Sequence, residues 1–333
     1  MQTKFALQIL YLYKMLKHLK FCRYRKGMVI DMGKFMVAGF VQIETIVKVD
    51  SLPLPYNKFV SVPDMVHTNV GGDGYSQAIA LRWLGNDVDF MSMIGKNGHD
   101  QLARLNSSGV DLKMDYVLPI LEAMPSAVIL YNQGERQILE DVKDARSVTY
   151  DEAIFEERIQ DKDMVVISDA NFCRPLLGLA KKYNKPLAVN VRRINEEKQR
   201  TKGDFLKAAD IIYVSEGDIE GDPYECLWDC CEKYDPEIFI LGLGRKGVLL
   251  YTKEENNVIK YQRVKTNEIV NTVGEGDALF SAFLHYYVKT GNPKEAIKNA
   301  LLFSSYKIGF VGTSNGFMTE EQIEQWKNLI WKM

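Results

Sequence analysis

Short apolar runs alternate with longer helical patterns along the chain from Lys34 onward. This alternation is typical of an α/β fold with a mostly parallel sheet, because each helix carries the chain back to the edge where the next strand begins. The runs are continuously apolar, which indicates strands buried on both faces. Central strands are predicted at residues 35–40, 88–93, 164–167, 187–191, 211–214 and 238–241.

Two segments interrupt this pattern. Residues 41–68 are rich in proline, and residues 114–140 alternate in polarity up to a turn at 132–134. Both segments are interpreted as strands outside the main sheet, and pairing between them would build a small β lid over one edge of the domain. No repeat or change of composition divides residues 32–333, so we expect one domain with lid segments near 41–68 and 114–140.

The charges balance overall but not along the chain. The sequence has 42 Lys and Arg against 44 Asp and Glu, a net charge of −2. Residues 1–30 contain seven basic residues and no acidic one, which leaves 35 basic against 44 acidic residues, or −9, from Asp31 onward. This acidic body lacks the net positive field that holds nucleic acid or an anionic membrane, so a small-molecule ligand is favoured.

Residues 1–31 form a basic N-terminal extension. Its apolar run at residues 5–13 is too short to span a bilayer, and it precedes the charges instead of following them as in a secretory signal. Three interpretations stay open: a flexible arm, an amphipathic helix at a membrane surface, or an upstream mis-start before Met28 or Met32.

The cysteines point to a reducing compartment. They are few, odd in number and scattered, and no export signal precedes them, so reduced thiols in a cytoplasm fit best. Cys226 and Cys230 are four residues apart on a predicted helix, but no histidine or second cysteine pair lies at ligand spacing. Core packing is therefore favoured over a zinc site.

The most informative motif opens a predicted helix at Asp277. Gly274 and Gly276 precede this aspartate, and apolar residues then recur at helical spacing until Gly291. The first amides of a helix lack an intrahelical acceptor, so a glycine-flanked helix start can bind an anion. Asp277 can serve there as a simple helix cap or as the base that takes a proton from an attacking hydroxyl.

A second glycine motif lies at Gly242-Leu-Gly-Arg-Lys-Gly247. It matches the dinucleotide pattern Gly-x-Gly-x-x-Gly, but that fingerprint requires a following helix, and residues 248–252 are predicted as a strand. A glycine loop between two strands can still let a nucleotide lie against bare backbone. The chain has no Gly-x-x-x-x-Gly-Lys-Ser/Thr stretch, which excludes a P-loop.

A third glycine segment, Gly71-Gly-Asp-Gly-Tyr-Ser-Gln-Ala78, also precedes a helical pattern. Its backbone can approach a polyhydroxylated ligand, and a tight turn before a packing helix is the alternative. Glu44 follows the first predicted strand, where open α/β sheets bind their ligands.

In this order, the three glycine segments and Glu44 resemble those of the ribokinase-like carbohydrate kinases, the phosphofructokinase-B (PfkB) family. Asn271-Thr-Val-Gly-Glu-Gly-Asp277 is similar to the family's Asp-Thr-x-Gly-Ala-Gly-Asp, and residues 71–78 are similar to its Gly-Gly-x-x-x-Asn-x-Ala. The resemblance covers about residues 34–330. It implies a three-layer α/β sandwich with a central, mostly parallel sheet and a β-strand lid, and transfer of the γ-phosphoryl group of ATP to a hydroxyl of a small sugar or sugar acid.

The resemblance also implies roles for individual residues. Asp277 would be the base, and the backbone at Gly274, Glu275 and Gly276 would form the anion hole. Mg²⁺ would bridge the ATP phosphates, held largely through water, with no metal ligand set from the protein. The sugar would contact Glu44, Gly71, Gly72 and Ser76, and the nucleotide would contact Ser215, Asp218, Gly242, Gly244, Gly247 and Asn299.

Several positions depart from the family pattern. Glu44 and Ser76 stand where Asp and Asn are usual, which reshapes the sugar pocket, and Ser215-Glu-Gly-Asp218 replaces an Asn-x-x-Glu motif that supports the metal. Asn271 replaces an aspartate that helps to bind a potassium-like ion, so weak activation by monovalent cations is expected. Glu275 adds a negative side chain beside the anion hole and opposes phosphate binding if it faces the phosphate.

The leading hypothesis is thus a cytoplasmic, ATP-dependent kinase of a small sugar or sugar acid. A non-catalytic sugar or nucleotide sensor, a pseudokinase on the same fold, is the alternative that the altered positions suggest. A nicotinamide oxidoreductase is weakened by the missing helix after Gly247. The unpaired lid strands favour a homodimer formed through the lid.

Overall fold

The computed structural model describes residues 32–331 except 62–63, 133–134, 193, 216–218 and 220. The basic extension expected at residues 1–31 therefore lies outside the described residues, as does Asp218. Among the described residues, no helix is both long enough and apolar enough to cross a membrane.

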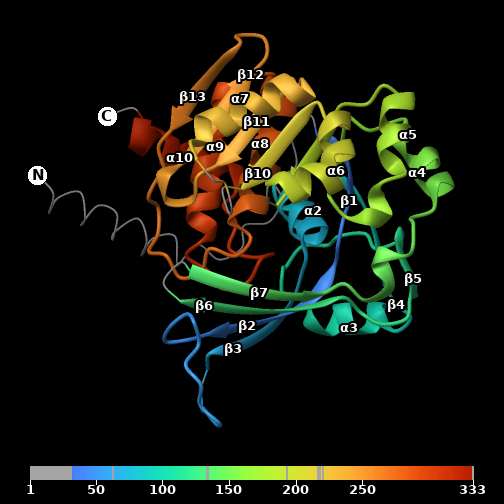
Figure 1. The fold of residues 1–333 in the computed structure, drawn as a ribbon, viewed down its shortest axis with the longest axis vertical. Helices are drawn as coiled ribbons and strands as arrows, with labels where there is room; N and C mark the ends of the chain where they lie inside the picture. The colour runs from blue at the N-terminus through green and yellow to red at the C-terminus, as the bar shows by residue number, and fades with distance from the viewer. Residues whose placement is uncertain are drawn as a thin grey trace, which may run out of the picture. The chain divides into compact units, whose positions relative to one another are not determined.

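A large sheet forms the middle layer of the described domain (Figure 1). From one edge to the other its strands are β13 (Asn257–Tyr261), β12 (Val248–Thr252), β11 (Ile238–Gly242), β10 (Ile211–Ser215), β9 (Leu187–Val191), β8 (Met164–Ser168), β1 (Lys34–Ala38), β4 (Asp87–Gly95) and β5 (Val117–Leu121). Neighbouring strands from β11 to β5 are parallel, and β12 and β13 form an antiparallel hairpin at the other edge. All the central strands predicted from apolar runs are confirmed, to within two residues at each end.

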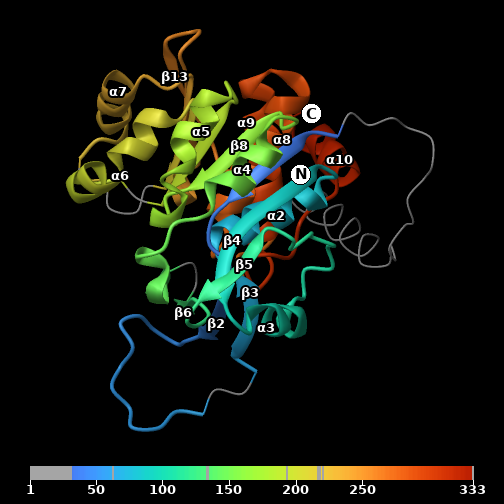
Figure 2. The same cartoon turned by 90° about the vertical axis from the view of Figure 1, so that its right-hand side faces the viewer.

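Helices cover both faces of this sheet, which gives the three layers (Figures 1 and 2). One face packs against α4 (Glu152–Ile159), α5 (Leu176–Lys182), α6 (Glu196–Ala208) and α7 (Pro223–Tyr234). The other face carries α2 (Asp73–Trp83), α8 (Glu275–Thr290), α9 (Pro293–Lys307) and α10 (Glu320–Trp331). Both faces bury apolar side chains: every residue of β8, β9, β11 and β12 is buried, as the continuous apolar runs predicted.

The second, smaller sheet is the lid. Its strands lie in the order β3 (Val66–Gly71), β2 (Gln42–Lys48), β6 (Ser126–Asn132) and β7 (Glu135–Asp141). β2 pairs with β6 in parallel, so the two interrupting segments do meet each other. The small core of the lid consists of Ile46, Ala127, Ile129 and Tyr131 together with Val273, which comes from the loop before α8.

The segment expected in the lid near residues 114–140 is in fact divided between the two sheets. β5 pairs in parallel with β4 in the large sheet, and only the strands from Ser126 onward enter the lid. The physical reason is the connection: α3 (Gly98–Leu105) between β4 and β5 provides the crossover that a parallel pair requires. Placing all of this segment in the lid was therefore wrong.

Candidate active site

Asp277 lies in the first turn of α8, where two glycines shape the backbone. Gly274 is the N-cap with a φ of 75°, and a Cβ placed on it would lie 2.9 Å from the backbone of Thr313. A Cβ on Gly276 would lie 2.8 Å from the hydroxyl of Tyr213. The position of Gly274 therefore requires glycine, a side chain at Gly276 would have to displace Tyr213, and the amides of this turn are left at the positive end of the helix dipole. The first turn of α8 is thus shaped by glycine, and its role as an anion hole stays a prediction.

The carboxyl of Asp277 is held by side chains from two other elements. Gln77 in α2 donates a hydrogen bond of 2.9 Å to its Oδ1, and Asn190 in β9 donates one of 3.0 Å to the same oxygen. Oδ2 forms no hydrogen bond within the described residues. One oxygen thus orients the carboxyl, and the other is available to accept a proton.

The surroundings raise the pKa of Asp277 to about 7. Burial is the largest cause, and the nearby carboxylates of Asp73 and Glu44 add to it, while the hydrogen bond from Gln77 and the charge of Arg192 act in the opposite direction. A carboxyl with a pKa near the working pH is well matched to general base catalysis.

Glu44 forms a cradle with the glycine segment before α2. Its Oε1 accepts hydrogen bonds from the Gly72 amide at 2.9 Å and from Gln42 Nε2 at 3.1 Å, and its Oε2 accepts one from Thr313 Oγ1 at 2.9 Å. Burial raises the pKa of Glu44. A Cβ on Gly71 would lie 2.1 Å from the Glu44 carboxylate, so only glycine fits beside it. The predicted sugar-side residues are thus brought together.

Ser76 is buried in the same region. Its Oγ has no hydrogen-bond partner among the residues that the structure describes. A buried hydroxyl without a partner is costly, so a ligand hydroxyl that reached it would gain a hydrogen bond.

Acidic side chains dominate this half of the site. Asp73 Oδ1 accepts hydrogen bonds from the amides of Phe40 and Gly74, at 3.0 and 2.7 Å. Arg192, which follows β9, donates to Asp73 Oδ2 at 3.3 Å and to Glu140 Oε1 of the lid at 2.7 Å. Its positive charge is thereby matched by two carboxylates, and it links the lid to α2.

A pocket of about 340 Å³ lies on the other side of the α8 start. Its lining includes most of the residues predicted on the nucleotide side, together with part of the anion hole: Ser215, Gly242, Gly244, Gly247, Glu275 and Gly276. Gly247 has a φ of 93°, and a Cβ on it would lie 2.0 Å from the carbonyl oxygen of Tyr261. Bare backbone therefore forms this wall, as the glycine loop predicted.

Asn299 does not line this pocket. Its side chain is buried in α9, and neither its Oδ1 nor its Nδ2 has a hydrogen-bond partner within the described part of the chain. Leu301, Ser304 and Ser305 are the α9 residues that face the pocket. Asn299 is two positions from Leu301, about 200° around the helix, so the two side chains leave opposite sides of it.

Arginines in the pocket were missed by the sequence analysis. Arg136 of β7, Arg245 and Arg263 all line it, and Arg136 Nη1 donates to the carbonyl oxygen and the hydroxyl of Thr272 at 3.2 and 2.9 Å. Arg263 Nε has no partner among the described residues. Arg136 and Arg263 lie outside the motifs and gave no signal, because only the fold brings their segments to the pocket, whereas Arg245 lies within the second glycine motif.

Glu275 also lines this pocket, so it faces the place where a phosphate would bind. Burial raises its pKa, whereas the positive charges of Arg263, Arg136 and Lys307 lower it. The repulsion expected from this departure is therefore partly offset by the basic residues around it.

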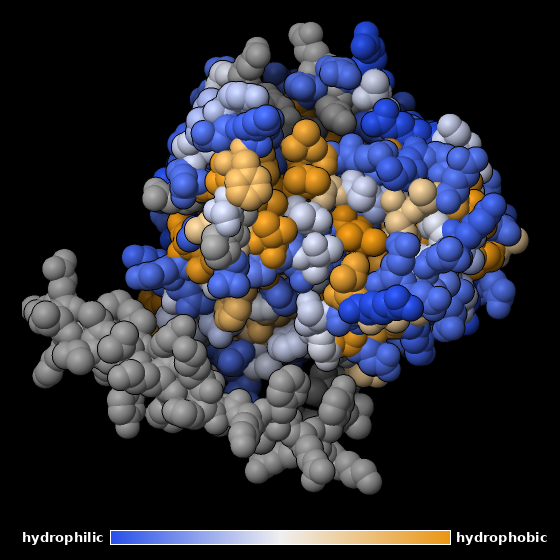
Figure 3. Space-filling model, turned by 90° about the horizontal axis from the view of Figure 1, so that it is seen from below, coloured by the Kyte–Doolittle hydropathy of each residue, from blue (hydrophilic) through white to orange (hydrophobic). Residues whose placement is uncertain are grey.

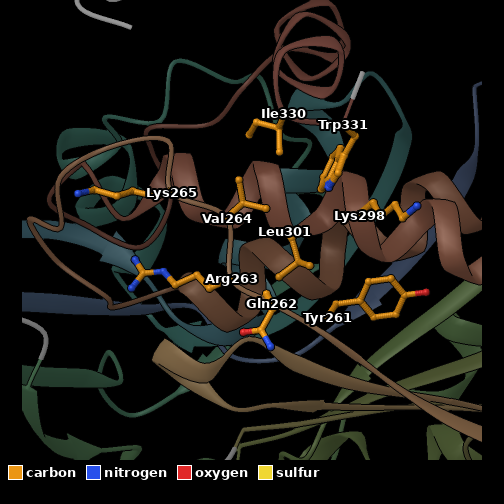
Figure 4. A pocket seen from close by; sticks show the side chains of 9 residues that line it. All are labelled: Tyr261, Gln262, Arg263, Val264, Lys265, Lys298, Leu301, Ile330 and Trp331. Carbon is orange, nitrogen blue, oxygen red and sulfur yellow. The ribbon is translucent and has the colours of Figure 1, made fainter. Parts of the chain in front are cut away.

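A second pocket, of about 330 Å³, lies beside α9 and α10 (Figure 4). Val264, Ile330 and Trp331 surround Leu301, and the chains of Lys265 and Lys298 extend away from it. The lining contains no carboxylate that could act as a base and no glycine backbone. The pocket next to the start of α8 is therefore the candidate active site.

Comparisons with known proteins identify the family of the chain. The model of the pfkB family carbohydrate kinases matches residues 32–320. A ribokinase from Dictyostelium discoideum is 20% identical over 313 residues, covering 86% of this chain and 98% of the relative. A deoxyribokinase from Salmonella typhi is 33% identical over 90 residues, which are 27% of this chain and only 28% of that protein.

The fold is also similar to that of a solved ribokinase structure. The structure of Arabidopsis thaliana ribokinase complexed with ribose and ATP superposes with a TM-score of 0.71 at 18% identity, covering 88% of this chain and 98% of that one. The ribokinase-like sandwich and its lid are thereby confirmed, and the match of the family model to most of the sequence shows that the chain belongs to the pfkB family of carbohydrate kinases.

Proposed function

We propose that the protein is an ATP-dependent kinase of a small sugar, with Asp277 as the general base. The observation that carries this proposal is the position of Asp277: hydrogen bonds connect it to α2 and β9, its Oδ2 is unoccupied by any described residue, and Glu44 and the α8 amides lie on its two sides. A base between an alcohol cradle and an anion hole has the arrangement that phosphoryl transfer needs.

In this mechanism the sugar hydroxyl gives its proton to Asp277 Oδ2 as its oxygen forms a bond to the γ-phosphorus of ATP. The bond between that phosphorus and the bridging oxygen breaks, and ADP leaves with the electron pair. The amides of the first turn of α8, aided by Arg136 and Arg263 at the pocket wall, stabilise the negative charge of the transferred group.

We assign ATP to the glycine-lined pocket because its lining of bare backbone and arginines suits a polyphosphate, and Mg²⁺ would come with it. The described residues contain no group of three or more His, Cys, Asp or Glu side chains able to hold a metal ion. Mg²⁺ keeps several waters and binds phosphate oxygens readily, so it would be held mainly by ATP and water. Its contribution would be to neutralise phosphate charge.

The acceptor half favours a neutral sugar over a sugar acid. Glu44, Asp73 and Glu140 are carboxylates, and the charge of Arg192 is already shared between the last two. A carboxylate on the acceptor would enter a region without a free counter-charge, and like charges at about 4 Å repel by about 1–4 kcal/mol near a protein surface. The sugar-acid part of the hypothesis is accordingly the weaker one.

The test is an ADP-release assay over a panel of pentoses, deoxypentoses, hexoses, nucleosides and sugar acids. A kinase will release ADP with at least one neutral sugar, and Asp277→Asn will abolish the release. Tight sugar binding by calorimetry without ADP release from any compound would instead favour the sensor. A preference for a sugar acid over its neutral analogue would contradict the substrate class.

The lid suggests a homodimer. Every residue of β7 is exposed, and this edge strand carries the apolar side chains of Ile138 and Leu139. Figure 3, which views the molecule from the side of the lid, shows apolar surface gathered between hydrophilic margins. Unpaired edges invite pairing with a second copy. Light scattering that gives the mass of one chain at micromolar concentration would exclude the dimer.

A further inference from the structure

A lysine is fully buried at the end of α9, beneath the anion hole. Lys307 has an exposed fraction of 0%, and its Nζ donates a hydrogen bond to the carbonyl oxygen of Gly312. No carboxylate among the described residues forms an ion pair with it. Burying an ammonium group without a paired carboxylate is expensive, so this position calls for an explanation beyond packing.

The turn of residues 307–313, which the hydrogen bond from Lys307 to Gly312 closes, contacts both the Glu44 cradle and the loop before α8. The carbonyl oxygen of Ile308 accepts hydrogen bonds from the amides of Val270 and Asn271, at 2.8 and 3.0 Å, and these residues lead into the anion-hole loop. At the other end of the turn, Thr313 donates to Glu44 and its backbone packs against Gly274. The ammonium therefore fixes the conformation of a turn that contacts both the acceptor cradle and the anion hole.

Three carboxylates of the site act on this ammonium. Burial lowers the pKa of Lys307 to about 8, while Glu44, Glu275 and Asp277 raise it. The group is thus mostly charged at neutral pH, and its positive charge acts on the carboxylates of Glu44, Glu275 and Asp277, with Arg136 as a second cation that lowers the pKa of Lys307.

The residues here do not fit a separately bound monovalent cation. Asn271 Oδ1 already accepts a hydrogen bond of 2.8 Å from the Val273 amide, and its Nδ2 has no acceptor among the described residues. An amide nitrogen is a donor and repels a cation. The carbonyl oxygen of Gly312 already accepts a hydrogen bond from the Lys307 ammonium, which would repel a second cation at the same oxygen.

We propose that the Lys307 ammonium acts as a tethered monovalent cation, which positions the turn and the anion-hole loop so that phosphoryl transfer needs no added K⁺. Lys307 is a positioning residue in this role, because it touches neither substrate. The kinetic part of the inference rests on the proposed kinase function, and a second readout does not.

The first experiment uses the wild-type protein. Sugar phosphorylation and the melting temperature are measured at constant ionic strength while tetramethylammonium chloride is replaced by KCl up to about 100 mM, which keeps screening unchanged. We expect kcat to change by less than about twofold, and the melting temperature to stay constant. Activation by K⁺ of more than about fivefold would overturn the proposal, because it would demonstrate a separate cation site.

The second experiment compares Lys307→Met, which keeps the length of the side chain without its charge, with Lys307→Ala, which leaves space. Both are expected to lose about 10²-fold in kcat, with a smaller change in KM, since preorganised charge acts on the transition state. Ammonium, K⁺ or ethylammonium will restore at least about tenfold to Lys307→Ala and nothing to Lys307→Met. Lys298→Met, on the exposed side of the same helix, is the control and keeps wild-type kcat.

The melting temperature gives the readout without catalysis. Lys307→Ala will be stabilised saturably by K⁺ or ammonium over tetramethylammonium, and the wild type and Lys307→Met will not, because only the alanine variant has room for a cation. Wild-type kcat in Lys307→Met, or an alanine variant that no cation affects in either measurement, would refute the tethered cation. If no sugar is phosphorylated, the proposed function fails while the melting data still decide. If neither variant folds, the wild-type titration decides.

Discussion

The two halves of the candidate site differ in charge. The side of the proposed acceptor, called the acceptor half, contains Glu44, Asp73 and Glu140 and one arginine, Arg192, which pairs with the last two. The pocket side, called the nucleotide half, contains three arginines and one glutamate: Arg136, Arg245, Arg263 and Glu275. The halves meet at the first turn of α8, where Asp277 faces one and Gly276 lines the other. In the proposed kinase, this difference would favour a polyphosphate on the basic side and would disfavour an anionic acceptor on the acidic side.

The halves also differ in how firmly their polar groups are fixed. Glu44 accepts three hydrogen bonds from the protein, and Asp73 is held by two amides and Arg192. In the nucleotide half Arg263 Nε has no partner in the described part of the chain, and the glycine loop supplies backbone. The carboxylates of the acceptor half are therefore fixed by the protein, while Ser76 Oγ in that half and Arg263 Nε in the nucleotide half could each gain a hydrogen bond from a ligand.

The largest effect is expected where the halves meet. Asp277→Asn keeps the size of the side chain and removes the base, so kcat should fall by about 10³-fold, within the range for loss of general base catalysis. KM for ATP should change by less than about threefold, because the nucleotide half is untouched. Steady-state ADP release measures both, and an Asp277→Asn variant with more than a tenth of wild-type kcat would remove Asp277 from this role.

The next largest effect tests the basic half. Arg263→Met should raise KM for ATP by about 10- to 100-fold, because a charge-assisted contact to phosphate is lost. KM for the sugar should stay within about twofold, since the acceptor half keeps its contacts. Lys265→Met is the matched control two residues away, with an exposed side chain. Equal effects of both variants on ATP would show that only net charge matters.

The pH dependence of kcat/KM reports the protonation state of Asp277. Because burial and the carboxylates of Asp73 and Glu44 raise the pKa of Asp277 to about 7, the free enzyme carries a protonated base below that pH. The value of kcat/KM should therefore rise about tenfold per pH unit up to about 7 and then level off. Arg192→Gln removes a positive charge that lowers the pKa of Asp277, so the rising part of the kcat/KM profile should move to higher pH. A rising part near pH 4 in the wild type would contradict the assignment.

The smallest effect is expected at Glu275, the acidic residue that lines the nucleotide half together with the three arginines. Glu275→Gln removes a negative charge that faces the phosphate pocket, so KM for ATP should fall by about two- to fivefold at low salt, and less at high salt. Initial rates at two ionic strengths measure this change. An increase in KM would mean that Glu275 instead holds Arg136 or Arg263 in place.

Local pattern predicted most of the fold. Continuous apolar runs gave the central strands, because strands buried on both faces leave no polar positions. β5 was misplaced in the lid because it was grouped with the alternating segment that follows it, although its own five residues are all apolar and only its pairing with β4 reveals its sheet. The glycine motifs lie where backbone approaches closely, as at Gly71, Gly247 and Gly274, while the anion hole that they predict stays a prediction.

Charged residues outside the motifs were not predictable in the same way. Arg136 lies on an exposed lid strand, and Lys307 ends an amphipathic helix where a lysine usually faces water. Their roles follow from tertiary contacts, with Thr272 in one case and Gly312 in the other. Asn299 shows the converse, because its place in a family pattern put it near the nucleotide, whereas the helix turns Leu301 there instead.

The packing of Val273 in the lid core links the position of the lid to the loop before α8. The residue just before the anion hole shares a hydrophobic cluster with Ile46, Ile129 and Tyr131, and Arg136 of the lid grips Thr272 next to it. Displacement of the lid would remove this support from the loop that leads into α8. In the proposed kinase, closure of the lid and phosphate binding at the first turn of α8 would therefore be coupled.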